Sequence, residues 1–215
     1  MMQVNILAGG PRQQYPENLF NQKAGWIGVD RGALILIKNH IRPQLAVGDF
    51  DSMTVQELVE VKKNCSEIIQ VNPVKDDTDT ELALASAFEQ LHADEVHLYG
   101  ATGGRLDHLL SNIFMLLKPK FNQYVEQVKI IDRQNCIYFF NAGQHCINVL
   151  PDYKYLSFVS LGKVENLTLP DEKYQLHNQS DQLPVAYVSN EFLKSTASFS
   201  FSSGTVAVIY SHDAN

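Results

Sequence analysis

Short apolar runs alternate with amphipathic segments through the first two-thirds of the chain. The amphipathic segments repeat apolar residues every three or four positions, which is typical of helices on a protein surface. In the last of them Leu106, Leu110, Ile113 and Leu117 share one face. Strands alternating with helices predict an α/β domain: a parallel sheet covered on both faces, in the three-layer, Rossmann-like manner. The predicted strands are Val4–Leu7, Trp26–Val29, Leu45–Val47, Ile68–Val71, Val96–Tyr99 and Val128–Ile131, and the predicted helices lie near Gly32–Asn39, Thr54–Asn64, Thr78–Leu91 and Leu106–Leu117.

The pattern changes after about Arg133. Helical spacing gives way to alternation with a period of two, which predicts a smaller, all-β antiparallel sandwich. Ser203-Gly204 is typical of a two-residue hairpin turn, whereas Pro170–Pro184 is polar and irregular and is expected to be a loop. We therefore expect one domain over residues 1–133 and a second over residues 134–215. The predicted strands of the second domain are Tyr155–Val159, Val164–Leu169, Ser198–Ser202 and Thr205–Tyr210.

Composition argues against several classes of protein. The chain has 215 residues, of which 45% are hydrophobic, and a formal net charge of −7. Nucleic acids and anionic membranes favour basic surfaces, so neither is an expected partner. The three cysteines are widely spaced and form no CxxC pair, which indicates reduced thiols rather than disulfides or a zinc cluster. Neither a signal-peptide pattern nor an apolar run of the ~18 residues needed to cross a membrane is present, so a cytoplasmic soluble protein is expected.

Five aspartates fall in two short clusters, Gly48-Asp49-Phe50-Asp51-Ser52 and Lys75-Asp76-Asp77-Thr78-Asp79, each after a predicted strand. The carboxyl ends of parallel strands meet at one edge of a sheet, where ligands of α/β proteins bind. Carboxylates gathered at such an edge repel one another unless a cation joins them, and Mg²⁺ prefers carboxylate oxygens together with substrate phosphates. The clusters therefore predict a magnesium site for phosphoryl or pyrophosphoryl transfer.

Both clusters also have a simpler structural interpretation. Asp49 and Asp51 are two residues apart, so in extended backbone both carboxylates would face the same way, but they would equally suit a turn before the next helix. Thr78 and Glu81 have the pattern of a capping box, which explains Thr78 as the start of a helix with Asp79 in its first turn. An acid near a helix N-terminus contributes only ~0.3–1 kcal/mol, which is too little to explain three aspartates in four residues.

A glycine-rich segment follows the predicted strand Val96–Tyr99. Gly100–Gly104 is typical of backbone that approaches a phosphate closely, and Arg105 could bind phosphate oxygens through both arms of its guanidinium. Asp107 is explained equally well as an acid in the first helical turn or as a catalytic residue, and His108 better as a hydrogen bonder at the helix start than as a general base. With Asp30-Arg31-Gly32-Ala33, four segments share the predicted edge and predict a magnesium–nucleotide site.

Taken together, these motifs resemble the thiamine pyrophosphokinase family in its bacterial form. The strong resemblance covers about residues 28–112, and a weaker match lies at Ser189-Asn190-Glu191-Phe192. The matching segments are Gly28-Val29-Asp30-Arg31-Gly32-Ala33, Val47-Gly48-Asp49-Phe50-Asp51-Ser52, Lys75-Asp76-Asp77-Thr78-Asp79-Thr80-Glu81 and Gly100-Ala101-Thr102-Gly103-Gly104-Arg105-Leu106-Asp107-His108.

The resemblance implies Mg²⁺-dependent transfer of a pyrophosphoryl group from ATP to the hydroxyl of thiamine, giving thiamine diphosphate and AMP. It implies a nucleotide-binding catalytic α/β domain, a thiamine-binding sandwich, and a homodimer whose active site lies between the α/β domain of one subunit and the sandwich of the other. By motif position Asp49, Asp51 and Asp79 would hold Mg²⁺ and act in catalysis, with Asp51 or Asp79 as the acceptor of the hydroxyl proton. Ser189 and Asn190 would approach thiamine. The positions that match the nucleotide site are Asp30, Lys75, Asp76, Thr78, Thr102, Arg105, Asp107 and His108.

One departure from the family and three alternatives remain open. Animal members carry a tryptophan beside thiamine near the C-terminus, whereas the only tryptophan here is Trp26, which is expected in the core. The aromatic candidates for contact with thiamine are Tyr187, Phe192 and Phe201. The same transfer to another alcohol, such as a pterin, is one alternative. A haloacid-dehalogenase-type phosphatase is the second, because Asp49-Phe50-Asp51-Ser52 after a strand resembles its nucleophile loop. The third is a nucleotide-sensing module without turnover.

Overall fold

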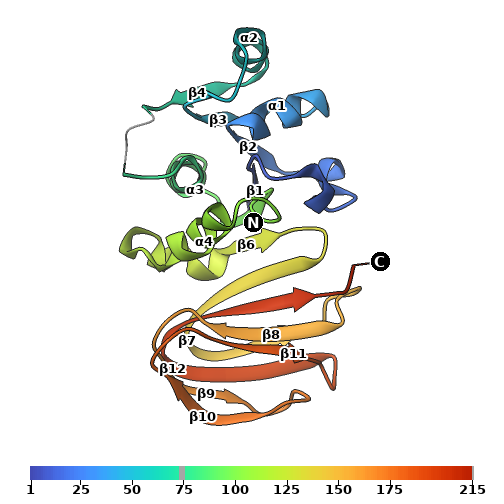
Figure 1. The fold of residues 1–215 in the computed structure, drawn as a ribbon, viewed down its shortest axis with the longest axis vertical. Helices are drawn as coiled ribbons and strands as arrows, with labels where there is room; N and C mark the ends of the chain where they lie inside the picture. Colours follow the sequence, from blue (N-terminus) through green and yellow to red (C-terminus); the bar gives the residue numbers. More distant parts are fainter. Residues whose placement is uncertain (73–75, 215) are drawn as a thin grey trace. The chain divides into compact units, whose positions relative to one another are not determined.

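The computed structural model describes residues 1–72 and 76–214, which form two compact units (Figure 1). The first unit comprises residues 1–121 and 130–133. The second comprises residues 122–129 and the described residues from 134 onward. In this part of the chain, no helix has both the length and the apolar character needed to cross a bilayer.

The first unit is built on a parallel sheet with the strand order β6-β5-β1-β2-β3-β4. The pairs from β5 to β4 are parallel, so the predicted α/β architecture is confirmed. The strands are β1 (Gln3–Leu7), β2 (Gly25–Val29), β3 (Leu45–Gly48), β4 (Glu67–Gln70), β5 (Glu95–Tyr99) and β6 (Val128–Ile131).

Helices cover both faces of this sheet, because apolar side chains point to both sides of each strand. Trp26 and Leu36 share one core cluster, and Ala33, Ala46 and Val61 share another, which places α1 (Arg31–Lys38) and α2 (Val55–Asn64) on the same face. The α3 helix (Asp79–Glu89) packs against β1, β2 and β3 on the opposite face (Figure 1). The remaining helical elements are α4 (Leu106–Phe114) and the 3-10 turns η1 (Arg12–Gln14), η2 (Leu19–Asn21), η3 (Met115–Leu117) and η4 (Pro119–Gln127).

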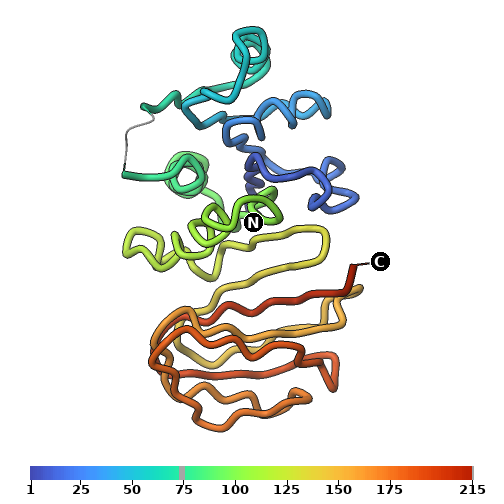
Figure 2. Tube along the Cα trace, viewed as in Figure 1, coloured from blue at the N-terminus to red at the C-terminus, as the bar shows by residue number. Residues whose placement is uncertain are grey.

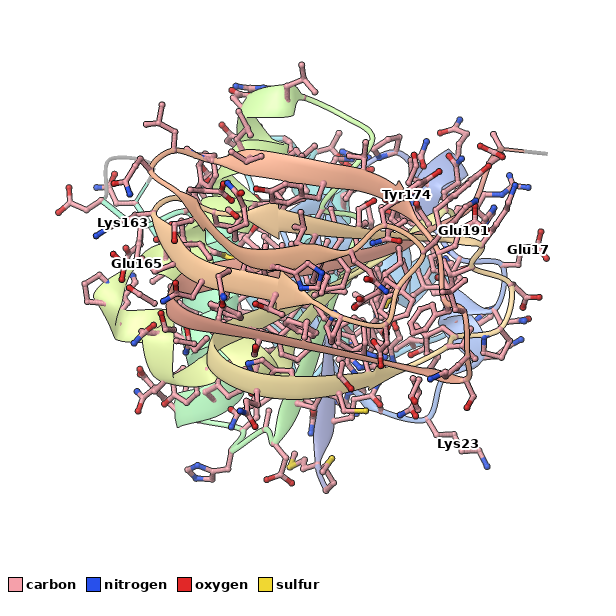
Figure 3. All side chains as sticks on the ribbon, turned by 90° about the horizontal axis from the view of Figure 1, so that it is seen from below. Glu17, Lys23, Lys163, Glu165, Tyr174 and Glu191 are labelled. Carbon is pink, nitrogen blue, oxygen red and sulfur yellow. The ribbon has the colours of Figure 1, made fainter. Side chains whose placement is uncertain are left out.

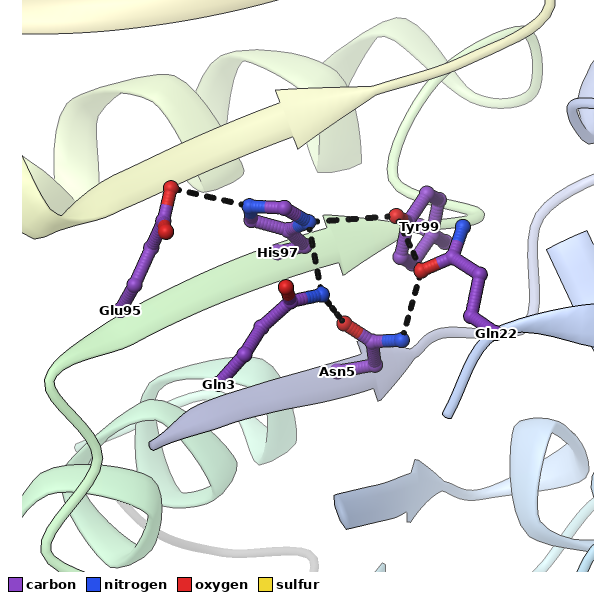
Figure 4. A network of polar contacts seen from close by, with 6 residues as sticks. All are labelled: Gln3, Asn5, Gln22, Glu95, His97 and Tyr99. Carbon is purple, nitrogen blue, oxygen red and sulfur yellow. Dashed lines mark hydrogen bonds and ion pairs between the residues drawn. The ribbon is translucent and has the colours of Figure 1, made fainter. Parts of the chain in front are cut away.

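Polar side chains of β1 and β5 form a partly buried network beside the first of these clusters (Figure 4). Asn5, which is fully buried, donates to the side chain of Gln22 at 2.9 Å and accepts from that of Gln3 at 2.7 Å. The His97 ring contacts the side chains of Gln3 at 3.1 Å and Glu95 at 3.0 Å. Buried polar atoms of these strands are thus hydrogen-bonded, as a stable core requires.

The second unit is an antiparallel sandwich organised around two long strands, β7 (Asn135–Asn148) and β12 (Thr196–Ser211), which pair along almost their whole length. The first half of β12 also pairs with β9 (Val164–Leu169), and its second half pairs with β8 (Tyr155–Ser160). The sheets are completed by β10 (Leu176–Asp181), which pairs with β9, and β11 (Val185–Asn190), which pairs with β8.

Two predictions for this unit are wrong. Ser203-Gly204 is not a hairpin turn, because β12 continues through it and pairs with β7 on both sides (Figure 2). The register shifts between Phe201 and Thr205, as at a β-bulge, and a Cβ at Gly204 would lie 2.2 Å from the Lys163 carbonyl oxygen. The expected loop Pro170–Pro184 contains β10, whose mostly exposed polar residues lack the alternation that marks a half-buried strand.

Candidate active site

Four loops of the first unit leave the carboxyl ends of neighbouring parallel strands, and three of them, those after β2, β3 and β5, carry predicted motifs. The segment Ala8–Pro11 follows β1, Asp30 follows β2, Asp49–Ser52 follows β3, and Gly100–Gly104 follows β5. The chain leaving β4 begins beside the third of these loops, because the amide of Val71 donates to the carbonyl of Gly48 at 3.1 Å. The sheet topology therefore gathers the sequence motifs at one edge.

The carboxylate of Asp30 is held inside the loop that carries the other two aspartates. Its Oδ1 accepts from the amide of Phe50 at 3.4 Å. A Cβ at Gly48 would lie 1.9 Å from the same oxygen, so only glycine leaves room for the carboxylate. Asp30 itself has φ 45° and ψ −124°, a sparsely populated conformation that costs on the order of 1–3 kcal/mol and is typical of functional sites. Asp30, Asp49 and Asp51 are thus brought together.

The loop Asp49–Ser52 is not extended, which corrects the geometry expected for its two aspartates. Phe50 has φ 58°, and its side chain is 3% exposed within the core between α1 and α2. The amide of Asp51 donates to Oδ1 of Asp49 at 3.0 Å, which is an Asx turn. Burial of Phe50 anchors the loop and leaves Asp51 exposed and Asp49 half-buried at the surface.

Arg31 joins this loop to the start of α1. Its guanidinium donates to the carbonyl of Ser52 at 2.8 Å and to the carboxylate of Glu57 at 3.3 Å. Glu57 in turn completes a reciprocal capping box with Thr54 at the start of α2. Both sides of the acidic loop are therefore tied to helices, which limits its freedom before any ligand arrives.

The second acidic cluster divides between structural and surface positions. Thr78 caps α3 as predicted, accepting from the amide of Glu81 at 3.2 Å, with Asp79 in the first turn. The second bond of the predicted capping box, from the Thr78 amide to the Glu81 carboxylate, is replaced. The buried Glu81 carboxylate accepts from Lys118 at 2.7 Å instead. Asp77 pairs with Lys120 at 2.6 Å, a hydrogen bond that lowers the pKa of this aspartate.

Asp76 is exposed, and Lys75 lies outside the described residues. The ion pair with a basic residue beyond α4 therefore explains Asp77, whereas Asp76 and Asp79 stay candidates for ligand contact.

The glycine-rich loop after β5 packs against the loop after β1. The amide of Gly10 donates to the carbonyl of Gly100 at 2.9 Å. The hydroxyl of Thr102 donates to the carboxylate of Asp132 at 2.7 Å, and both side chains are buried. Thr102 therefore fixes the loop from within, and its contact with nucleotide stays a prediction.

Arg105 and Asp107 form an exposed ion pair at the start of α4. Both guanidinium arms point to the same carboxylate, with Nε donating to Oδ1 at 3.1 Å. The hydrogen bond from Arg105 lowers the pKa of Asp107 to about 2, and Oδ1 also accepts from the amide of His108 at 3.1 Å. The Arg105 guanidinium, which was predicted to bind phosphate, thus binds the Asp107 carboxylate. An incoming phosphate would have to share the guanidinium with Asp107 or displace this carboxylate. The His108 side chain is exposed.

The weaker motif lies at the end of β11 in the second unit. Ser189 has φ 60° and is exposed, whereas Asn190 is 2% exposed. The Asn190 side chain accepts from the amide of Tyr174 and donates to its carbonyl, both at 2.8 Å. Asn190 is therefore used to hold a neighbouring loop, and any contact with thiamine would depend on the surface that this loop forms.

The aromatic candidates near that motif differ in exposure. Phe201 is 3% exposed and stacks on Phe199 in the core. Tyr187 donates to Asp181 at 2.8 Å, and burial together with this bond raises its pKa to about 12. Phe192 is half-buried and stacks on Tyr210. Trp26, at 3% exposed, is confirmed as a core residue.

Within the described residues, no three Asp, Glu, His or Cys side chains already converge as a metal cluster. The residues that sequence reasoning missed are those that shape the loops, namely Arg31, Phe50, Asp132 and the segment Ala8–Pro11. The segment Ala8–Pro11 could have been recognised from the sequence, because Gly9-Gly10 follows an apolar strand just as Gly100 does.

Comparison with known proteins gives matches over both units. The family model described as "Thiamin pyrophosphokinase, catalytic domain" matches residues 16–129, and that described as "Thiamin pyrophosphokinase, vitamin B1 binding domain" matches residues 144–206. The chain is 36% identical to thiamine pyrophosphokinase of Bacillus subtilis (strain 168) over 99% of its own length and 100% of that protein.

Two crystal structures resemble the whole fold. A Lactobacillus plantarum protein is 48% identical, with a TM-score of 0.93 and all of both chains covered. A thiamin pyrophosphokinase family protein of Enterococcus faecalis is 41% identical, with a TM-score of 0.94 over 99% of this chain and 100% of that one.

Proposed function

The chain belongs to the thiamin pyrophosphokinase family, and on this premise we propose that it transfers a pyrophosphoryl group from ATP to the hydroxyl of thiamine, giving thiamine diphosphate and AMP. One observation carries the proposal to this chain's own residues: the Asp30 carboxylate, against Gly48, is held within the loop of Asp49 and Asp51. Family membership does not favour a pterin acceptor or a phosphatase.

The reaction needs the thiamine oxygen to attack the β-phosphorus while the bond from that phosphorus to the departing AMP oxygen breaks. Catalysis of this kind is mostly positioning and neutralisation of charge. Backbone amides of Gly100–Gly104 and the Arg105 guanidinium would bind phosphate oxygens at the start of α4. Asp51 and Asp79 are the two candidates for accepting the hydroxyl proton.

The carboxylates fit a hard divalent cation, because the oxygen donors of Asp30, Asp49 and Asp51 come from two neighbouring loops that are hydrogen-bonded to each other at the sheet edge. Asp49, Asp51 and Asp79 are the proposed Mg²⁺ ligands, with Asp30 supporting the loop. When bound, Mg²⁺ would neutralise phosphate charge and orient the leaving group.

A homodimer in the cytoplasm, with one subunit's nucleotide loops completed by the partner's sandwich, is the proposed assembly. An apolar stripe on α4 and η3 supports it, because Leu106, Leu110 and Leu117, predicted to share one helical face, are 74%, 48% and 37% exposed. Phe114, at 45% exposed, extends this stripe. The stripe starts at Leu106, which lies in the chain between the proposed nucleotide-site residues Arg105 and Asp107. A monomeric mass by light scattering at micromolar concentration, in the presence of both substrates, would contradict the dimer.

The decisive experiment is incubation with ATP, Mg²⁺ and thiamine, followed by separation of nucleotides and thiamine esters. The expected products are AMP and thiamine diphosphate in equal amounts. Release of inorganic phosphate, or tight ATP binding without turnover, would contradict the proposal. Thermal protection by thiamine, and none by a pterin alcohol, tests the acceptor separately.

A further inference from the structure

One carboxylate of the second unit is buried without a full set of partners. Glu172 has no exposed surface, and its Oε2 accepts from the amide of Asp171 at 3.2 Å. Its Oε1 has no hydrogen-bond partner in the part of the chain that the structure describes. A buried oxygen in this state costs free energy, so its persistence calls for an explanation.

Glu172 lies where two segments of the second unit meet. It forms a β-bridge with Phe192, and the amide of the next residue, Lys173, donates to the carbonyl of Glu191 at 3.2 Å. With the two bonds between Asn190 and Tyr174, these contacts join the Glu172 loop (Asp171–Tyr174) to the Ser189 segment (Ser189–Phe192). Figure 3 labels Tyr174 and Glu191, one from each segment. Glu172 is therefore joined directly to the segment that carries the motif predicted to approach thiamine.

The charged groups around Glu172 do not stabilise its ionised form. Asp171 is negative and accepts from the amide of Ser198 on β12 at 2.9 Å. Lys173 pairs with Glu191 at 2.6 Å, and Lys154 contacts the hydroxyl of Tyr155 at 3.1 Å. On β12 the hydroxyl of Tyr210, whose ring stacks on Phe192, donates to the carbonyl of Asn148 at 3.0 Å. Burial raises the pKa of Glu172 to about 7; hydrogen bonds from the backbone amides of Glu172 and Asp171 oppose this rise, and the charge of Asp171 adds slightly to it.

We propose that Glu172 is a positioning residue that makes thiamine binding depend on pH, by holding the Ser189 segment in place only while its carboxyl is neutral. A neutral carboxyl is tolerated in an apolar site, whereas a carboxylate regains solvation only if the bridge to Phe192 opens. The proton lost goes to solvent. The inference rests on the proposed function, because it assumes that the Ser189 segment contacts thiamine.

The test compares the pH dependence of the KM for thiamine in the wild-type enzyme and in Glu172→Gln. We expect the wild-type KM to rise by about tenfold between pH 6 and pH 8, as one ionisation near pH 7 requires, and the Gln variant to lack this rise. The kcat should change with pH in the same way in both. Glu165→Gln removes an exposed carboxylate paired with Lys163, and it should keep the wild-type profile.

Three outcomes would overturn the proposal. One is an identical KM profile in the wild type and Glu172→Gln. Another is a wild-type KM that falls as pH rises and does so only with Glu172 present, because this would mean that the carboxylate attracts the thiamine cation directly. The third is loss of the pH-dependent KM in Glu165→Gln as well.

Hydrogen exchange separates this inference from the proposed function. Without any substrate, and after correction for intrinsic rates, amides of residues 189–192 should exchange faster at pH 8 than at pH 6 in the wild type only. Glu172→Leu, which keeps an apolar interior, should protect them at both pH values. If exchange behaves so but no thiamine diphosphate forms, the function fails and the switch stands; if product forms and exchange is the same in all variants, the switch fails.

Discussion

The acidic loop of the first unit and Glu172 of the second unit place carboxylates in opposite environments. Asp49 and Asp51 lie at the surface of a loop held by a buried phenylalanine, where water or a cation reaches their oxygens. Glu172 is fully buried and faces no cation in the described residues that offsets its charge. Access to solvent therefore suits the carboxylates of the acidic loop to ligand binding, whereas burial favours the neutral form of Glu172 and suits it to sensing of pH.

Both regions depend on backbone conformations that side chains rarely adopt. Asp30 and Phe50 have φ of 45° and 58°, and Ser189 has φ of 60°. Such strain persists only where the surrounding packing offsets it. In the first unit the offset comes from burial of Phe50, and in the second from the bonds that join Asn190 to Tyr174.

The largest expected effect is that of removing the buried anchor of the acidic loop. Phe50→Ala should lower the free energy of unfolding by ~3–5 kcal/mol, because it leaves a cavity among α1, α2 and β3. Urea unfolding measures the change. Val55→Ala, at a position that is 77% exposed, should stay within ~0.5 kcal/mol of wild type. A loss below ~1 kcal/mol for Phe50→Ala would mean that packing does not hold the loop.

Glu172 should make the stability of the protein fall as pH rises. Its pKa is about 7 in the folded protein and 4.5 in the reference state. The free energy of unfolding that neutral Glu172 contributes is therefore complete below about pH 4.5. It is lost between about pH 4.5 and about pH 7, and it does not change further above that pH. The loss should be about 3 kcal/mol relative to Glu172→Gln, measured by urea unfolding across this window. Parallel pH curves for the two proteins would refute the contrast between buried and exposed carboxylates.

Neutralising the aspartates of the proposed metal site should cost activity rather than stability. Asp49→Asn, Asp51→Asn and Asp79→Asn should each lower kcat by ~10²-fold or more, comparable with the loss of other charge-stabilising groups. Asp94→Asn is the matched control, because Asp94 lies just before β5 at the opposite edge of the sheet. Near-wild-type turnover in all three would remove them from the chemistry.

The smallest effect separates two helix caps of similar sequence. Thr78→Ala and Thr54→Ala should each cost about 1 kcal/mol of stability, because each side chain accepts from a backbone amide at a helix start. Only Thr78→Ala is expected to lower turnover, since Thr78 precedes Asp79. Equal turnover in the two variants would place the start of α3 outside the site.

The order of strands and helices in the first unit could be predicted well, because its strands are short apolar runs separated by amphipathic helices. The shared edge of Asp30, Asp49 and Gly100 followed from the parallel order alone. The conformation of the acidic loop could not be predicted, because the positive φ of Phe50 depends on how its side chain packs among α1, α2 and β3, which only the folded structure determines. The pairing of Asp77 with Lys120 was hidden for the same reason.

The second unit was harder to predict. The strand β7 was missed, although it pairs with β12 along most of its length. The strand β11 was also missed, and β10 was taken for a loop, because both are edge strands with mostly exposed residues and lack the alternation of a half-buried strand. Glu172 fell inside that expected loop, where a glutamate is ordinarily exposed. Nothing in its neighbouring residues indicates burial.

Local chemistry, read from the sequence alone, determined the α/β and antiparallel character of the two halves, the family and the residues available for binding phosphate and a cation. These properties follow from side-chain type and short-range periodicity, which tertiary contacts do not change. Tertiary structure alone decided which carboxylates are tied, paired or buried. The environment of Asp30 beside Gly48, of Asp107 beside Arg105 and of Glu172 opposite Phe192 arises when folding brings backbone and side chains together, and for Asp107 and Glu172 that environment shifts the pKa in opposite directions.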